Sequence, residues 1–201
     1  MTSKTLRMLL AGAVIATGAC NKSASYSGEN TATAETKTTA PSASNSDPVA
    51  SAESAAPAAL AHKATIMVAD ASGAMKTVRQ GTNGWTCIPD DPQTPGPDPM
   101  CFDTNAAKWV QAMLGHKPPP NGTPGVMYML EGGTDASNTD PYAKKPTNEN
   151  DWIKTGPHIM IVGSKEMLSG YPSGAKPDTS APYVMWAGTP YAHLMVPVTR
   201  S

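Results

Sequence analysis

The sequence lacks an apolar run long enough to cross a membrane as a helix, and it lacks any marked excess of charge. Its longest apolar stretch, residues 8–16 (MLLAGAVIA), falls well short of the about 20 residues that a membrane-spanning helix needs. The formal net charge is -1 at pH 7, and no basic cluster is present. We therefore expect no nucleic-acid partner, because such proteins carry a basic surface.

The motifs of several large enzyme classes are also missing. The sequence contains no G-x-S-x-G, G-x-G-x-x-G, Walker A or H-E-x-x-H pattern. An S-x-x-K at residues 173–176 and a K-T-G at 154–156 occur in the reverse of the order used by penicillin-binding enzymes. No marked nucleophile remains.

Cysteine is scarce, and the first of the three cysteines follows the apolar run. Residues 17–20 (TGAC) resemble the lipobox of bacterial lipoproteins, although Thr17 stands where that family usually has leucine. The resemblance implies a signal peptide over residues 1–19 and a lipid on Cys20, which would anchor the chain to a membrane. Asn21 favours the outer membrane, facing the periplasm. The alternative is an ordinary signal peptide without a lipid.

Composition then divides the remaining chain into two parts. Residues 20–59 are rich in Ala, Ser and Thr, which cannot bury enough surface to offset the entropy of ordering, so we expect a disordered tether. A tail that binds a partner is the alternative. Residues 60–201 have the size of one ordinary domain.

Apolar alternation and turn residues predict a sheet-dominated α+β domain with one or two helices. Asp103 or Thr104 is typical of a helix N-cap, and Gly115 is typical of the end of that helix. A short helix is expected at residues 164–168. Pro197 predicts that the last strand lies at a sheet edge, because proline lacks the N–H of the ladder. Strands are expected at residues 64–69, 75–79, 84–88, 126–130, 158–162, 183–187 and 192–198.

Cys87 and Cys101 flank a proline-rich segment at residues 89–99. We expect a disulfide between them, worth about 3 kcal/mol in the chain-entropy model. Metal binding by this pair is the alternative, but no C-x-x-C or further cysteine pair supports it. A solvated acidic loop is expected here, with calcium binding as its alternative. The loop holds Asp90, Asp91 and Asp98, and Asp103 follows beyond it.

Two His-x-Met sequences carry a further pattern with metal-ligating chemistry. In a strand the side-chain period of two places His158 with Met160, and His193 with Met195, on one face. If the strands are neighbours, two imidazoles and two thioethers converge, a soft set that suits Cu(I) and is similar to the sets of periplasmic copper carriers. The alternative is structural, because the sequence has 12 Met and a single Phe, so that methionine acts as a general core filler.

Two further alternatives use the same histidines or nearby aromatic residues. A small hydrolase would use His158 or His193 as a base, oriented by Asp140 or Glu131. A binding pocket for a small ligand would be lined by aromatic side chains: Trp85, Trp186 and Tyr191.

Several segments resemble those shared by a family of uncharacterised exported bacterial proteins. They are residues 81–87 (GTNGWTC), 99–101 (PMC), 138–141 (NTDP), 156–158 (GPH) and 188–193 (GTPYAH). The resemblance implies an exported domain from about residue 64 to 198, without an activity. We therefore expect a lipid-anchored cell-envelope protein with a binding or structural role and a protein or small-molecule partner. A copper-binding protein is the first alternative, and a hydrolase is the second.

Overall fold

The computed structural model describes residues 47–94 and 96–199, which form an α+β domain as the sequence predicts. The predicted Cys87–Cys101 disulfide is present. None of the helices in these residues is long and apolar enough to cross a membrane. Cys20, the predicted signal peptide and the tether up to residue 46 lie outside the described residues. The elements are α1 (Pro48–Ser54), α2 (Ala58–Ala61), β1 (Thr65–Ala69), β2 (Met75–Arg79), β3 (Thr86–Ile88), β4 (Met100–Phe102), α3 (Thr104–Leu114), β5 (Gly125–Met129), β6 (Ala136–Ser137), β7 (Trp152–Ile153), β8 (His158–Val162), the 3-10 helix η1 (Glu166–Leu168), β9 (Tyr183–Met185) and β10 (His193–Pro197).

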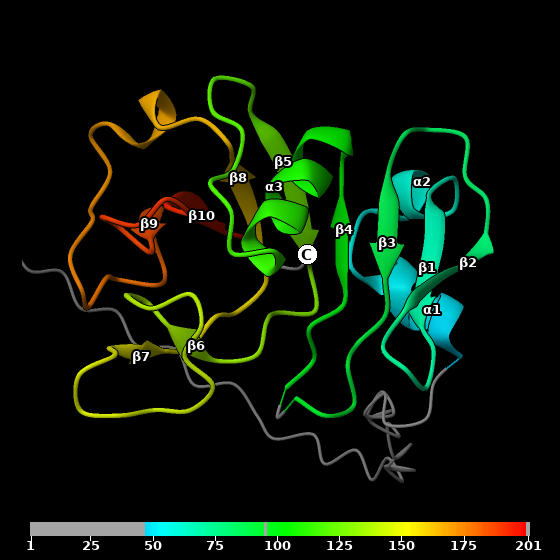
Figure 1. The fold of residues 1–201 in the computed structure, drawn as a ribbon, viewed down its shortest axis with the longest axis horizontal. Helices are drawn as coiled ribbons and strands as arrows, with labels where there is room; N and C mark the ends of the chain where they lie inside the picture. Colours follow the sequence, from blue (N-terminus) through cyan, green and yellow to red (C-terminus); the bar gives the residue numbers. More distant parts are fainter. Residues whose placement is uncertain (1–46, 95, 200–201) are drawn as a thin grey trace, which may run out of the picture. The chain divides into compact units, whose positions relative to one another are not determined.

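Eight strands form one sheet in the order β2–β1–β3–β4–β5–β8–β10–β9 (Figure 1). Neighbouring strands run antiparallel, except β1 and β3, which are parallel. The short strands β6 and β7 pair with each other in a separate ladder. This order brings β5, β8, β10 and β9 side by side, although long stretches of sequence separate them.

Side chains alternate between the two faces of the sheet along each strand, and both faces are covered. On one face, Met127 and Met129 of β5 pack with Trp109 of α3. On the other, Tyr128 packs with Trp85 beside the disulfide, under α1 and α2. Figure 1 shows α3 on the near side of the sheet and α1 and α2 on the far side.

The helix α3 begins and ends where the sequence predicts. The Asp103 carboxylate accepts hydrogen bonds from the backbone N–H of Ala106 (2.8 Å) and from that of Val126 (3.0 Å). It therefore caps the helix and joins its first turn to β5. Gly125 of β5 permits the close approach, because a Cβ at that position would lie 2.3 Å from the Ala106 backbone nitrogen.

Residues 47–59 are folded, which corrects the predicted tether boundary at residue 59. They form α1 and the start of α2. Ala52 and Ala55 are fully buried there, and so is Ala61 at the end of α2. The composition of these residues predicted disorder because alanine has little surface to bury. Here small side chains let two short helices approach the sheet and the disulfide closely, with the Ala52 carbonyl 3.6 Å from Cys101 Sγ.

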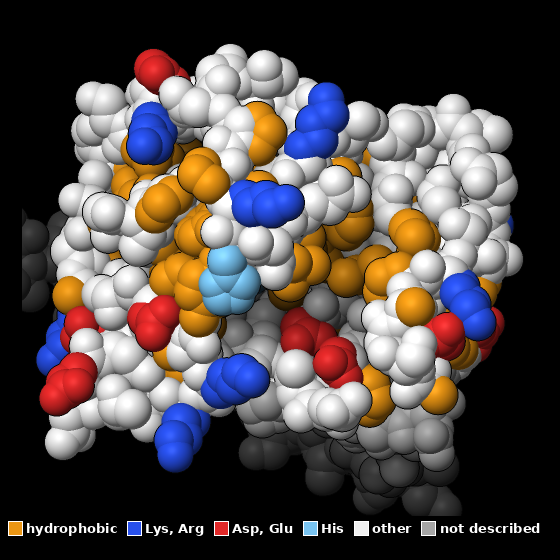
Figure 2. All heavy atoms as spheres, in the orientation of Figure 1, with side chains coloured by type: hydrophobic (Ala, Val, Ile, Leu, Met, Phe, Trp, Pro, Cys, Tyr) orange, Lys and Arg blue, Asp and Glu red, His pale blue; other side chains and the backbone are white. Residues whose placement is uncertain are grey.

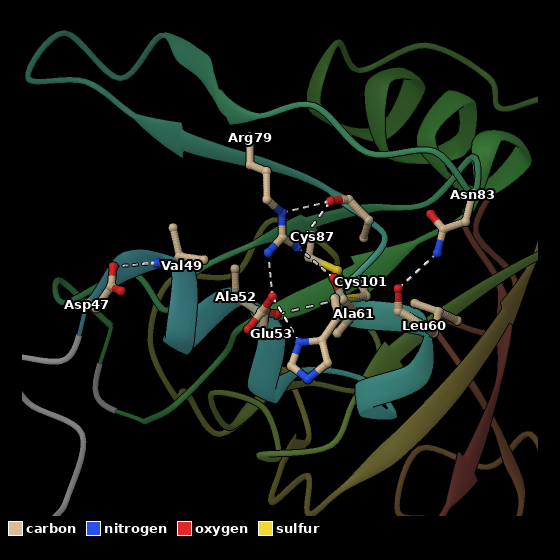
Figure 3. Close-up of polar contacts among 12 residues, drawn as sticks. Asp47, Val49, Ala52, Glu53, Leu60, Ala61, Arg79, Asn83, Cys87 and Cys101 are labelled. Atoms are coloured by element: carbon tan, nitrogen blue, oxygen red, sulfur yellow. Dashed lines mark hydrogen bonds and ion pairs between the residues drawn. A yellow bond between two sulfur atoms is a disulfide. The ribbon is translucent and has the colours of Figure 1, made fainter.

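Arg79 of β2 holds this pair of helices against the sheet (Figure 3). Its guanidinium donates to Glu53 of α1 (2.5 Å), to the carbonyl of Ala61 at the end of α2 (2.7 Å) and to that of Ala64 (3.1 Å). The hydrogen bond from Arg79 holds the pKa of the Glu53 carboxyl below its ordinary value. One side chain thus connects α1, α2 and the start of β1.

The predicted position of the last strand is wrong. β10 lies inside the sheet between β8 and β9, not at an edge. Pro197 is tolerated because it is the final residue of β10, beyond the part that pairs with β9, and it faces only His158 of β8. The strands β4, β6 and β7 were not predicted, because they are too short to show an alternating pattern.

Candidate functional site

The two His-x-Met sequences lie on adjacent antiparallel strands and point to the same face of the sheet. Met160 of β8 and Met195 of β10 are cross-strand partners, and directly opposed residues share a face. His158 and His193, two residues before each methionine, therefore face the same way. All four side chains are buried under the side of the sheet that α3 covers.

The register places the two histidines at opposite ends of this arrangement. His158 faces Pro197 in the register, whereas His193 begins β10 four residues earlier. Four residues of strand correspond to an offset of about 13 Å between the two histidines along the strand direction. The four predicted ligands therefore form two His–Met halves, which meet at the methionine pair.

His193 lies in an aromatic setting. Its ring centroid is 5.4 Å from that of Trp109 on α3 and 4.8 Å from that of Trp186, and both indoles stand nearly perpendicular to the imidazole. The two indoles are parallel, with centroids 6.1 Å apart. Trp186 is fixed by hydrogen bonds from its indole Nε1 to the Ser137 carbonyl and from its backbone N–H to the Asn138 carbonyl.

The hydrogen bonding of His193 defines its tautomer. Nδ1 lies 3.0 Å from the backbone carbonyl of Tyr191, and a carbonyl only accepts, so Nδ1 carries the hydrogen and donates it. The pKa of His193 is lowered to about 4, mainly by burial and in smaller part by the neighbouring His158. The ring is therefore neutral at pH 7 and Nε2 holds a free lone pair. Nε2 has no hydrogen-bond partner, although the residue is only 1% exposed.

Two further methionines, which the sequence did not predict as site residues, lie next to the histidines. Met185 of β9 is the cross-strand partner of His193, and Met129 of β5 is the cross-strand partner of His158. Both are buried in the same core cluster as Met160 and Met195. Local sequence carries no signal for them, because their place depends on which strands pair and in what register.

The other histidine, His158, has similar local bonding. Its Nδ1 lies 2.6 Å from the carbonyl of Gly156, and burial lowers its pKa. A small cavity of about 10 Å³ adjoins it, with Tyr183 and Met195 in its wall. Burial also raises the pKa of the Tyr183 hydroxyl to about 12, so this hydroxyl keeps its proton at neutral pH.

A larger cavity of about 90 Å³ opens near His193. Trp109 and Ala192 line it, together with Pro190 and a run of three prolines at residues 118–120. Lys165 and Ser164 also contribute to its wall. Figure 2 shows hydrophobic side chains across the middle of the face on which α3 lies. The Trp109 ring adjoins both the cavity and the His193 ring.

The hydrolase alternative gains nothing from this geometry. In both histidines the Nδ1 atom that a carboxylate would orient is bonded to a backbone carbonyl instead. The Asp140 carboxylate accepts from the backbone N–H of Tyr142. Hydrolysis by His158 or His193 stays a prediction without a specific observation in its favour.

The aromatic pocket predicted from Trp85, Trp186 and Tyr191 is wrong as one site. Trp186 and Tyr191 lie on the α3 face, but Trp85 packs against Tyr128 on the opposite face. Because side chains alternate along β5, Tyr128 points to the opposite face, and Trp85 packs there with it, away from Trp186 and Tyr191.

The carboxylates of the acidic loop accept hydrogen bonds from N–H groups of the same loop. The Asp90 carboxylate accepts from the N–H of Asp98, and the Asp98 carboxylate accepts from the N–H of Asp91 and from the Thr134 hydroxyl. Asp103 is used as the cap of α3. Among the described residues, no three His, Cys, Asp or Glu side chains are grouped to hold a metal ion.

Comparison with known proteins found no relative that shares this site. No family model, no curated protein and no solved structure matches the chain.

Proposed function

We propose that this chain is an exported, lipid-anchored cell-envelope protein whose folded domain binds Cu(I) and does not catalyse a reaction. The lipobox-like segment ending at Cys20 supports the anchor, and Asn21 after it supports a periplasm-facing place at the outer membrane. The Cys87–Cys101 disulfide supports an oxidising compartment.

The observation that carries the metal site is the buried, unpartnered Nε2 of His193. A buried polar atom without a partner is rare in folded proteins and needs a reason. A metal-ligating histidine donates its other ring N–H to a carbonyl or carboxylate, which fixes the tautomer and the ring orientation. The bond from His193 Nδ1 to the Tyr191 carbonyl has that form.

The groups around Nε2 define the kind of metal. Met185 lies across the ladder from His193, with an expected Cβ separation of about 5 Å, and Met195 lies two residues along β10. Thioether sulfur with imidazole nitrogen is a soft ligand set that selects Cu(I). These ligands are neutral and the site is buried, so a divalent ion would bring twice the uncompensated charge into the core.

Cu(I) would reach His193 from the cavity that Trp109 and Ala192 line. The Trp109 indole lies between this cavity and the His193 ring, so its movement would open a path from the cavity to Nε2. The proposed role of the site is to hold Cu(I) reversibly in a compartment where free Cu(I) is reactive.

The binding test uses the purified full chain without oxygen, titrated with Cu(I) against a Cu(I) chelator and followed by tryptophan fluorescence and by melting temperature. We expect Cu(I) to quench Trp109 and Trp186 and to raise the melting temperature. His193→Gln should remove the quenching and reduce the rise in melting temperature. Met185→Leu should weaken binding at least tenfold, because it deletes a sulfur from a site of unchanged volume.

Met167→Leu is the matched control, because Met167 is 39% exposed on η1 and outside the site. Its titration should equal that of the wild type. If the wild type takes up no Cu(I), the copper role fails, and the domain is left with a binding or structural role in the envelope.

Membrane anchoring is tested separately by fractionating cells that express the wild type or Cys20→Ser. The wild type should sediment with membranes, and the variant should not. Equal sedimentation of both would contradict the lipid anchor.

A further inference from the structure

The strand register around His193 recurs around His158. Each histidine begins a strand, has a methionine two residues later, and has a second methionine directly opposite on the outer neighbouring strand. For His193 these are Met195 and Met185. For His158 they are Met160 and Met129.

The repetition follows from a local two-fold relationship within the sheet. Met160 and Met195 oppose each other on the antiparallel pair β8–β10, and β5 and β9 flank this pair on its two sides. Turning the four strands about the midpoint of the methionine pair exchanges His158 with His193 and Met129 with Met185. The symmetry applies to the pairing register and not to every side chain. Met127 on β5, for example, corresponds to Tyr183 on β9.

The ring of His158 is set in the same way as that of His193. Its Nδ1 is bonded to the carbonyl of residue 156, two positions earlier, as the Nδ1 of His193 is bonded to the carbonyl of residue 191. A hydrogen on Nδ1 leaves the Nε2 lone pair for a ligand in the neutral ring. His158 is 4% exposed, and Met129 and Met160 are 6% and 7% exposed.

We propose a second Cu(I) site formed by His158, Met129 and Met160, separate from the site at His193. This inference rests on the proposed copper function. The two histidines are four strand positions apart, about 13 Å between Cα atoms, and both rings are held toward the outer ends by their Nδ1 bonds. One ion bound by both imidazoles would need the two Nε2 atoms about 4 Å apart, twice a normal metal–nitrogen distance.

The small cavity beside His158 differs from the one beside His193. It is lined by Thr155, Thr179 and Tyr183, and Trp109 is not among its lining residues. The Met160–Met195 pair lies between the two sites. Each of these methionines would bind the ion of its own site and contact the opposing methionine of the other site. The domain would then hold two Cu(I) ions in one buried layer.

The test measures the Cu(I) stoichiometry of the full chain against a chelator, with tryptophan fluorescence recorded in parallel. The wild type should bind two equivalents. His158→Gln and His193→Gln should each bind one, and the double variant should bind none. Quenching should persist in His158→Gln, because Trp109 and Trp186 lie beside His193, and should be lost in His193→Gln.

Leucine variants guard against misfolding as the cause of lost binding. Met129→Leu should weaken only the equivalent that His158→Gln removes, at an unchanged melting temperature of the metal-free protein. Met127→Leu is the matched control, since Met127 lies on the same strand and face but opposes Met160 and not a histidine. It should leave both equivalents intact.

The outcomes separate the two proposals. A single equivalent that His158→Gln leaves intact overturns the second site and leaves the His193 site standing. Loss of all binding in His158→Gln also overturns it, in favour of one shared site. Absence of any binding by the wild type overturns the copper function itself.

Discussion

Met160 and Met195 oppose each other at the centre of the buried face, with one histidine at each end of the arrangement. The spacing of two residues in each His-x-Met keeps imidazole and thioether on this face. The antiparallel register then decides that the histidines diverge and the methionines meet. A parallel pairing of the same two strands would have placed the imidazoles side by side, and the ligand chemistry would differ.

Arg79 is expected to be the main link between the helical pair α1–α2 and the sheet. Arg79→Met keeps most of the side-chain volume but removes the bonds to Glu53, Ala61 and Ala64. We expect the free energy of unfolding to fall by about 2 kcal/mol, measured by urea denaturation.

Lys76→Met on the same strand is the matched control for Arg79→Met. The ion pair of Lys76 with Asp70 is largely exposed on the lysine side and is screened by solvent, so its loss should change the free energy of unfolding much less. Equal effects of the two variants would contradict the role given to Arg79.

The Glu53–Arg79 ion pair should make part of the stability depend on pH. The pKa of Glu53 is lower in the folded state than its ordinary value of 4.5. A lowered carboxyl pKa contributes stability that is present above the unfolded pKa and is lost as the pH falls through the folded pKa. The stability difference between the wild type and Glu53→Gln should therefore be constant near neutral pH and shrink below about pH 4.5. A difference that stays unchanged to pH 3 would show that Glu53 is not acting as a charged partner.

The disulfide is expected to stabilise the domain and to resist reductants. Cys87 and Cys101 are cross-strand partners on β3 and β4 and are fully buried beneath α1. The double variant Cys87→Ala/Cys101→Ala should lose about 3 kcal/mol, because the unfolded chain is no longer cross-linked. In the wild type, thiol labelling after mild reductant should appear only under conditions that unfold the domain. Rapid labelling of the native protein would mean that α1 does not protect the bond.

Gly125 should be irreplaceable where α3 meets β5. A Cβ there would lie 2.3 Å from the backbone nitrogen and 2.7 Å from the Cα of Ala106, so the helix would have to move. We expect Gly125→Ala to lower stability by about 3 kcal/mol. Gly174→Ala is the control, because no atom lies within 4 Å of its added Cβ, and its melting temperature should match the wild type.

Much of the fold could be predicted because its signals are local. The cap at Asp103, the stop at Gly115 and the alternation in β8 each lie within one element, and α3 and β8 appear where expected. The helices α1 and α2 could not be predicted, since their burial depends on the disulfide and Ile66 beneath them.

The candidate site was predicted in part for the same reason. Period two in a strand is sufficient to join each histidine to its own methionine. The contributions of Met129 and Met185 depend on pairing between strands far apart in the sequence, and the contact of Trp109 with His193 depends on how α3 packs on the sheet. No local pattern encodes those relationships.

The most direct test of the account is the nuclear magnetic resonance of the His193 ring in the full chain, with isotopically labelled histidine nitrogen and Ag(I) as a redox-inert substitute for Cu(I). Without metal at neutral pH, the spectrum should show hydrogen on Nδ1 and none on Nε2. With Ag(I), the Nε2 resonance should split through coupling to the silver nucleus, while Nδ1 keeps its hydrogen. An Nε2 resonance that carries a hydrogen, or that shows no coupling under saturating Ag(I), would contradict a metal site at His193.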